Sequence, residues 1–283
     1  MNNSVEPPAK RAFSTVLLAG NFVLKHSPYS SLVKCLFGGT IVPADALGVN
    51  MVNLALYSDQ VIPENFAIDL RLLELVKATR AGVRIGYVPS GPEPEQRFFR
   101  ERKSYYAQCG FDLSLFYDLN EPHSSRDLAE LFGCDAIHLS GGHTGNFLQQ
   151  LKISGMFNPL RNWALRGGVL IGASAGAILM TPTIAVDALF SGEKPENVMG
   201  GNALNLLPFE FFPHLNTQEN YLPELIRYSA NTAWPIVAVN DGDGIVVSGG
   251  LVECIGDPVW IFEGTIKKAN EIRLLGLSIL QSS

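Results

Sequence analysis

Between residues 82 and 186, short apolar runs alternate with longer runs of helical periodicity. The strand-like runs are residues 82–89, 112–117, 135–139 and 169–171, and the helix-like runs are residues 93–109, 125–132, a segment from Thr144, and 159–166. Strands that alternate with helices are typical of βαβ units, in which a parallel sheet carries helices on both faces. We therefore expect an α/β fold with a mainly parallel sheet sandwiched by helices.

The two ends of the chain extend this pattern. Residues 1–13 read as a flexible polar tail, and a first strand is predicted at 15–18 and a helix at 67–80. A helix is also predicted at 217–229, after which four strand-like runs follow one another at 236–239, 244–247, 251–255 and 259–262. We expect extra antiparallel strands near the C-terminus. No repeat or linker is evident, so residues 14–283 are predicted to form a single domain.

Composition excludes several classes of function. The net charge of −6 argues against a nucleic-acid partner or an anionic membrane, both of which attract a basic face. The four cysteines are far apart and form no C-x-x-C pair, so neither a metal nor a redox site is expected. The N-terminus lacks the apolar stretch of a signal peptide. Residues 167–186 carry no charge, but their glycines, proline and hydroxyl residues indicate a buried strand and turn. We expect a cytoplasmic protein with no membrane span.

The segment Gly172-Ala173-Ser174-Ala175-Gly176 matches G-x-S-x-G, the nucleophile elbow. A serine at the tip of a sharp strand-to-helix turn is exposed to substrate, and small neighbours let the backbone pass closely. The N–H group that follows the nucleophile, here that of Ala175, can stabilise an oxyanion. The apolar run before the turn and the apolar run after it supply the expected strand and helix. Ser174 is therefore a candidate nucleophile.

A serine nucleophile needs a base, and histidine is the usual one. His138 lies inside a predicted strand, and His123 and His26 lie in polar loops. His143 follows the Gly141-Gly142 turn near the end of a strand, and His214 follows Pro213 downstream of the elbow. Spacing alone leaves both His143 and His214 open.

Four segments resemble the S51 serine peptidases, which include the aspartyl dipeptidases (peptidase E) and, more remotely, cyanophycinase. They are SGGHTGNFLQQL, GVLIGASAGAILMTPTI, NALNLLPFEFFPHLN and DPVWIF, in this order. The resemblance covers roughly residues 83–262. It implies a class I glutamine-amidotransferase-like fold, with serine where the amidotransferases carry cysteine.

The resemblance also implies the site. Ser174 would be the nucleophile and His214 the general base, and the N–H groups of Gly142 and Ala175 would form the oxyanion hole. The substrate would be a short peptide, cleaved through an acyl-enzyme intermediate without a metal or organic cofactor. Nothing in it fixes whether the protein forms an oligomer.

Three positions depart from the family pattern. The acid that orients the histidine should follow the Pro-Thr-Ile block closely, where this chain offers Asp187 slightly early and Glu193 slightly late; we expect Asp187. The Gly-Gly turn is followed by His143 and not by asparagine. The arginine-rich stretch of aspartyl dipeptidases is replaced by TQENYLPELIR, in which Arg227 comes last, so a preference for N-terminal aspartate is doubtful. Tyr221 and the aromatic residues 209–212 would suit a neutral side chain or the core.

Two other functions fit the same residues. One is an esterase of the α/β-hydrolase type, which would cleave aryl esters but no dipeptide. The other is a non-catalytic binding protein on the same scaffold, against which the presence of both Ser174 and His214 argues. A glutamine amidotransferase does not fit, because the elbow holds no cysteine.

Overall fold

The structure of the protein is a computed structural model that describes residues 52–61, 63–76, 82–272, 274 and 277–281. These residues all belong to one compact unit, Gly48–Ser283. The predicted tail at residues 1–13 and the predicted strand at 15–18 lie outside the described residues.

The central sheet has eight strands in the order β12-β9-β8-β1-β5-β4-β2-β3. Its parallel part consists of β1 (Asn53–Tyr57), β5 (Val169–Ala173), β4 (Ala136–Leu139), β2 (Val83–Val88) and β3 (Phe111–Phe116). On the other side of β1, β8 (Gly244–Ser248) and β9 (Leu251–Ile255) continue the sheet antiparallel, and β12 (Ser278–Gln281) pairs parallel with β9. The prediction of a mixed α/β fold with a mostly parallel central sheet is confirmed.

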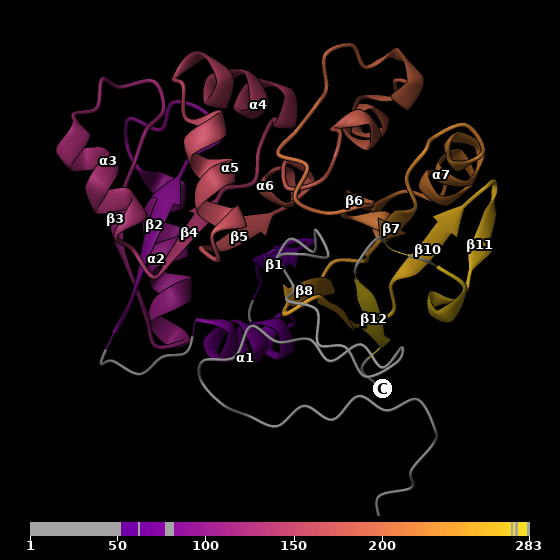
Figure 1. The fold of residues 1–283 in the computed structure, drawn as a ribbon, viewed down its shortest axis with the longest axis horizontal. Coiled ribbons are helices and arrows are strands. Elements are labelled where there is room, and N and C mark those ends of the chain that lie inside the picture. Colours follow the sequence, from indigo (N-terminus) through magenta and orange to yellow (C-terminus); the bar gives the residue numbers. More distant parts are fainter. Residues whose placement is uncertain (1–51, 62, 77–81, 273, 275–276, 282–283) are drawn as a thin grey trace, which may run out of the picture. The chain divides into compact units, whose positions relative to one another are not determined.

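Helices cover both faces of this sheet (Figure 1). Helices α1 (Phe66–Leu75) and α2 (Arg97–Gln108) share one hydrophobic core with Ile171 of β5. Helices α4 (Thr144–Ile153), α5 (Phe157–Leu165) and α6 (Ala175–Ile178), together with the end of α3 (Ser125–Phe132), share the other core with Leu170. Because neighbouring strand residues face opposite sides, both sides of the inner strands β1, β5 and β4 are buried. The edge strand β3 instead exposes Asp112 and Ser114.

A second sheet of four strands, in the order β11-β10-β7-β6, adjoins the second core. Strands β6 (Glu210–Phe212) and β7 (Ile236–Ala238) are parallel and are connected by a segment that holds α7 (Tyr221–Ser229). Strand β10 (Val259–Phe262) pairs antiparallel with β7, and β11 (Thr265–Lys267) pairs antiparallel with β10 at the edge of the sheet. In the described part of the chain, the connections hold the 3₁₀ helices η2 (Ala185–Ser191), η3 (Pro195–Asn197), η4 (Leu215–Thr217) and η5 (Ala269–Glu271).

Most of the predicted elements lie where the sequence placed them, and α3 has the predicted bounds because Ser124 and Asp127 form a capping box at its start. Strands β1, β6, β11 and β12 were not predicted. The uncharged residues 167–186 form a strand, a turn and a short helix, as expected. In the described part of the chain, no helix is both long enough and apolar enough to cross a membrane.

Candidate active site

Ser174 sits at the tip of the turn between β5 and α6, with φ 49° and ψ −110°. A positive φ is uncommon for a residue with a side chain, and it turns the serine out of the sheet edge. The flanking glycines allow this turn. A Cβ on Gly172 would lie 2.5 Å from the nitrogen of Ala177, and one on Gly176 would lie 2.1 Å from the carbonyl oxygen of Leu139. The glycine spacing of the motif therefore follows from backbone crowding.

His214 lies two residues beyond the end of β6, also with a positive φ of 58°. Its Nε2 atom is 2.9 Å from the Oγ atom of Ser174, which is hydrogen-bonding distance. The edge of the ring contacts Phe190 at 5.9 Å between centroids. The imidazole side chain is 26% exposed, so it remains accessible from solvent. The structure thus brings together the predicted nucleophile and the predicted base.

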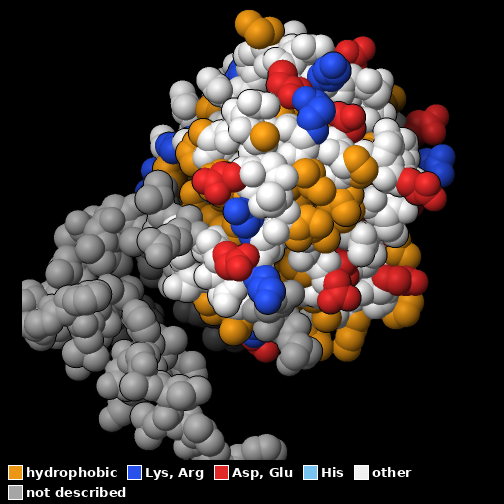
Figure 2. All heavy atoms as spheres, turned by 90° about the vertical axis from the view of Figure 1, so that its right-hand side faces the viewer, with side chains coloured by type: hydrophobic (Ala, Val, Ile, Leu, Met, Phe, Trp, Pro, Cys, Tyr) orange, Lys and Arg blue, Asp and Glu red, His pale blue; other side chains and the backbone are white. Residues whose placement is uncertain are grey.

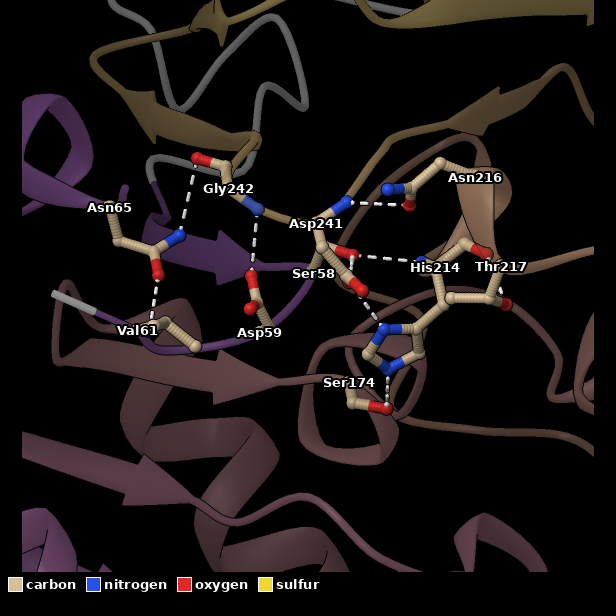
Figure 3. A network of polar contacts seen from close by, with 10 residues as sticks. All are labelled: Ser58, Asp59, Val61, Asn65, Ser174, His214, Asn216, Thr217, Asp241 and Gly242. Atoms are coloured by element: carbon tan, nitrogen blue, oxygen red, sulfur yellow. Dashed lines mark hydrogen bonds and ion pairs between the residues drawn. The ribbon is translucent and has the colours of Figure 1, made fainter. Parts of the chain in front are cut away.

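The carboxylate next to His214 belongs to Asp241, which lies in the turn after β7 (Figure 3). Its Oδ1 atom is 2.5 Å from Nδ1 of His214. The backbone N–H of Asp241 donates to Oδ1 of Asn216 at 3.0 Å. Ser174, His214 and Asp241 therefore form a chain of hydrogen bonds with the geometry of a catalytic triad. Sequence reasoning missed Asp241, although the polar turn Asn240-Asp241-Gly242-Asp243 directly follows a predicted strand.

The expected orienting acid, Asp187, lies elsewhere. It belongs to η2, and its Oδ1 atom accepts a hydrogen bond of 2.5 Å from Oγ1 of Thr144, at the start of α4. Burial raises the pKa of this carboxyl, while the Thr144 bond and the nearby His143 lower it. The alternative, Glu193, is exposed. Among the described residues it is Asp241, and neither of these two, that hydrogen-bonds the ring of His214.

The other described histidines have different surroundings. His143 caps α4, because its Nδ1 atom accepts the N–H of Asn146 at 3.3 Å. His138 is buried and bonded to Tyr106, and burial lowers its pKa to about 3. His123 stacks on Tyr117. The choice between His143 and His214, which spacing left open, is therefore decided by geometry in favour of His214 as the partner of Ser174.

The Gly141-Gly142 turn lies beside the nucleophile. A Cβ on Gly141 would be 3.7 Å from Cβ of Ser174. Gly142 has a φ of 135°, and a Cβ there would lie 2.1 Å from Oγ of Ser90, so only glycine fits. Ala175 is the first residue of α6, and its N–H therefore has no partner within that helix. Both predicted oxyanion donors belong to segments next to Ser174.

The site is open. The side chain of Asp241 is 34% exposed. Two cavities of about 430 and 420 Å³ lie elsewhere, one next to Trp234 and Phe262 and one next to Thr183 and Tyr228, and neither is lined by a triad residue.

On the face that carries α7, β10 and β11, apolar side chains gather between interspersed acidic and basic ones (Figure 2). In the described region, no group of three or more His, Cys, Asp or Glu side chains is arranged to hold a metal ion.

A sequence model of peptidase family S51 matches residues 54–255, which is most of the chain. The chain belongs to peptidase family S51. The matched region begins in β1 and ends in β9, and it includes Ser174, His214 and Asp241.

Individual S51 relatives match parts of the chain. An uncharacterized peptidase of Listeria monocytogenes is 37% identical over 83 residues, which cover 29% of this chain and 40% of that protein. The chain therefore matches well under two thirds of this relative's length. Peptidase E of Salmonella newport is 27% identical over 169 residues, covering 56% of this chain and 69% of the relative.

Two solved structures share the fold. One is from Listeria monocytogenes EGD-e, with a TM-score of 0.57 and 23% identity, covering 71% of this chain and 96% of that chain. The other is a peptidase from an acI-B1 Actinobacterium, with a TM-score of 0.56 and 13% identity, covering 78% and 95%. At these identities the likeness concerns the fold alone.

Proposed function

We propose that this S51 family member is a serine peptidase that hydrolyses short peptides through an acyl-enzyme intermediate. The observation that carries the proposal is the unbroken chain from Oγ of Ser174 to Nε2 of His214, and from Nδ1 of His214 to the carboxylate of Asp241. It joins a nucleophile, a base and an orienting acid at hydrogen-bonding distances. Asp241 takes the role that we had expected of Asp187.

In the proposed reaction, Oγ of Ser174 attacks the peptide carbonyl while Nε2 of His214 accepts its proton. Asp241 holds the ring in the tautomer that leaves Nε2 free to accept, and it stabilises the imidazolium that forms. His214 then returns the proton to the leaving nitrogen as the C–N bond breaks. The amine product departs, and the acyl group stays on Ser174 as an ester. Water, activated by the same imidazole, releases the acyl group. Each step uses only side chains that the structure places together.

The N–H groups of Gly142 and Ala175 remain the proposed oxyanion donors. Support comes from their places, on a glycine turn packed beside Ser174 and on the residue that follows the nucleophile. Donors fixed in the backbone before the reaction need no reorganisation when the oxyanion charge develops. We further propose the class I glutamine-amidotransferase-like arrangement, because the elbow follows a central parallel strand.

A preference for an N-terminal acidic residue has little support. The guanidinium of Arg227 donates to Glu196 from Nη1 at 2.5 Å and from Nη2 at 3.1 Å, and to Glu224 from Nε at 2.8 Å. Glu196 and Glu224 therefore already neutralise and hydrogen-bond the guanidinium that would have to bind a substrate carboxylate. The side chains of Tyr221 and Phe212 are buried in the core and do not form a substrate pocket. We therefore expect dipeptides with neutral N-terminal residues to be cleaved at least as well as those with aspartate.

The experiment is hydrolysis of a dipeptide library by the wild type and by Ser174→Ala. We expect the variant to lose on the order of 10³-fold or more in kcat, as when a triad nucleophile is removed. Near-normal turnover by Ser174→Ala would refute the mechanism. Cleavage of an aryl ester but of no dipeptide would favour the esterase alternative, and no turnover of either substrate would favour a binding protein.

A further inference from the structure

Ser58 lies directly after β1 and is completely buried, although no sequence motif marks it. Its hydroxyl makes two hydrogen bonds within the site. The backbone N–H of His214 donates to Oγ of Ser58 at 2.8 Å, and Oγ lies 3.0 Å from Oδ1 of Asp241. The serine therefore contacts two members of the proposed triad without touching the third (Figure 3).

The direction of both bonds is fixed by chemistry. A hydroxyl has one hydrogen to donate, and an ionised carboxylate can only accept. Because the N–H of His214 donates to Ser58, the single hydroxyl hydrogen of Ser58 is available for Asp241. The same Oδ1 atom also accepts from Nδ1 of His214. One hydroxyl thus connects the main chain of His214 to the carboxylate that faces its ring.

The loop after β1 holds the turn of Asp241 at further points. The N–H of Ser58 donates to the carbonyl of Asp243 at 3.2 Å, and Oδ1 of Asp59 accepts the N–H of Gly242 at 2.8 Å. Nδ2 of Asn65 donates to the carbonyl of Gly242 at 3.2 Å. These contacts anchor the turn that holds Asp241, which follows β7 of the second sheet, to the segment that follows the central strand β1. Within this set, Ser58 alone bonds the carboxylate itself.

We propose that Ser58 is a positioning residue for the triad: its hydroxyl fixes the orientation of Asp241 relative to His214. This inference rests on the proposed function. The left-handed backbone of His214 is costly for a residue with a side chain, and its N–H needs an acceptor to be held there. Loss of the hydroxyl leaves the N–H of His214 without its acceptor and removes one of the donors to Oδ1 of Asp241. The ring and the carboxylate are then aligned less often in the reactive geometry.

The test measures kcat and KM for a dipeptide that the wild type cleaves, and the rate of phosphonylation of Ser174 by a fluorophosphonate probe. Ser58→Ala should lower kcat and the phosphonylation rate together, by about 10- to 100-fold, as expected for loss of a hydrogen bond to a charged group. KM should stay within about twofold, because the side chain of Ser58 is fully buried beneath the site. Ser58→Cys keeps the size of the buried side chain but donates weakly, and it should lose nearly as much.

Thr217→Ala is the matched control. Oγ1 of Thr217 donates to the carbonyl of His214 at 2.8 Å, so this change also removes one bond to the main chain of His214 but none to Asp241. Its kcat should fall by less than about threefold. Wild-type rates in Ser58→Ala or Ser58→Cys would overturn the inference, as would an equal loss in Thr217→Ala. If instead Ser174→Ala still cleaves the dipeptide and the wild type resists the probe, the proposed function itself fails.

Discussion

At the residue scale, the side chains of the candidate site are brought together in two different ways. Ser174 is recognisable because the crowding at Gly172 and Gly176 forces a local pattern. Asp241 has no such pattern: it hydrogen-bonds the ring of His214 from a turn 27 residues later in the chain. Ser58 likewise reaches the site across a separation of 156 residues from His214. Residues fixed by local backbone geometry are readable from the sequence, whereas residues brought in by tertiary packing are not.

Replacing each of the two candidate acids, Asp241 and Asp187, by asparagine separates their roles. Asp241→Asn should lower kcat by about 10³- to 10⁴-fold, because an amide facing Nδ1 no longer stabilises the imidazolium or fixes the tautomer. Asp187→Asn should lower kcat less than about tenfold, because the amide oxygen can still accept from Thr144. Both are measured as kcat on a cleaved dipeptide. A greater loss in the Asp187 variant than in the Asp241 variant would return Asp187 to the triad.

At the scale of elements, the alternation of strands and helices predicted most of the central sheet. The four missed strands β1, β6, β11 and β12 are all short, with three to five residues each. Strand β6 has only three residues, and β1 is a short apolar run whose periodicity does not distinguish a strand from a buried helix segment. The predicted helix at 217–229 begins only at Tyr221, because η4 occupies the residues just after His214. Two of the four missed strands, β1 and β6, lie directly before Ser58 and two residues before His214.

The contact between α6 and β4 sets a strict size limit. Gly176→Ala should lower the free energy of unfolding by about 2–3 kcal/mol, at the upper end of the cost of overpacking, because its Cβ would meet the backbone oxygen of Leu139 at 2.1 Å. Gly91→Ala is the control, because a Cβ there meets nothing within 4 Å, and its effect should stay within about 0.5 kcal/mol. Urea denaturation measures both. Equal stability of the two variants would contradict the crowding of the elbow.

At the scale of the whole molecule, one buried carboxyl links pH to stability. Glu210 of β6 is fully buried, and its Oε1 atom is bonded to Thr183 and Tyr228. Its Oε2 atom has no hydrogen-bond partner among the described residues. Burial raises the pKa of Glu210 from 4.5 to about 7, against the lowering effect of the two hydrogen bonds. The folded protein therefore keeps this proton over a pH range in which the unfolded chain has lost it.

Stability should consequently fall as the pH rises from about 4.5 through about 7. The contribution of Glu210 is fully present below the unfolded value of 4.5 and is lost as the folded pKa is passed, with a total on the order of 3 kcal/mol. Glu210→Gln keeps a polar group of the same size without a titration. Its Tm should vary less than that of the wild type between pH 5 and pH 8. Parallel curves for the two proteins would show that Glu210 does not titrate in this range.

The order of the triad along the chain, with Ser174 first, His214 second and Asp241 last, has a consequence during synthesis. A nascent polypeptide that has emerged from the ribosome only as far as β7 carries the hydroxyl and the imidazole but lacks the acid that aligns them. The proposed chain of hydrogen bonds from Ser174 to Asp241 is complete only after translation has passed residue 241 and the turn has docked on the loop after β1.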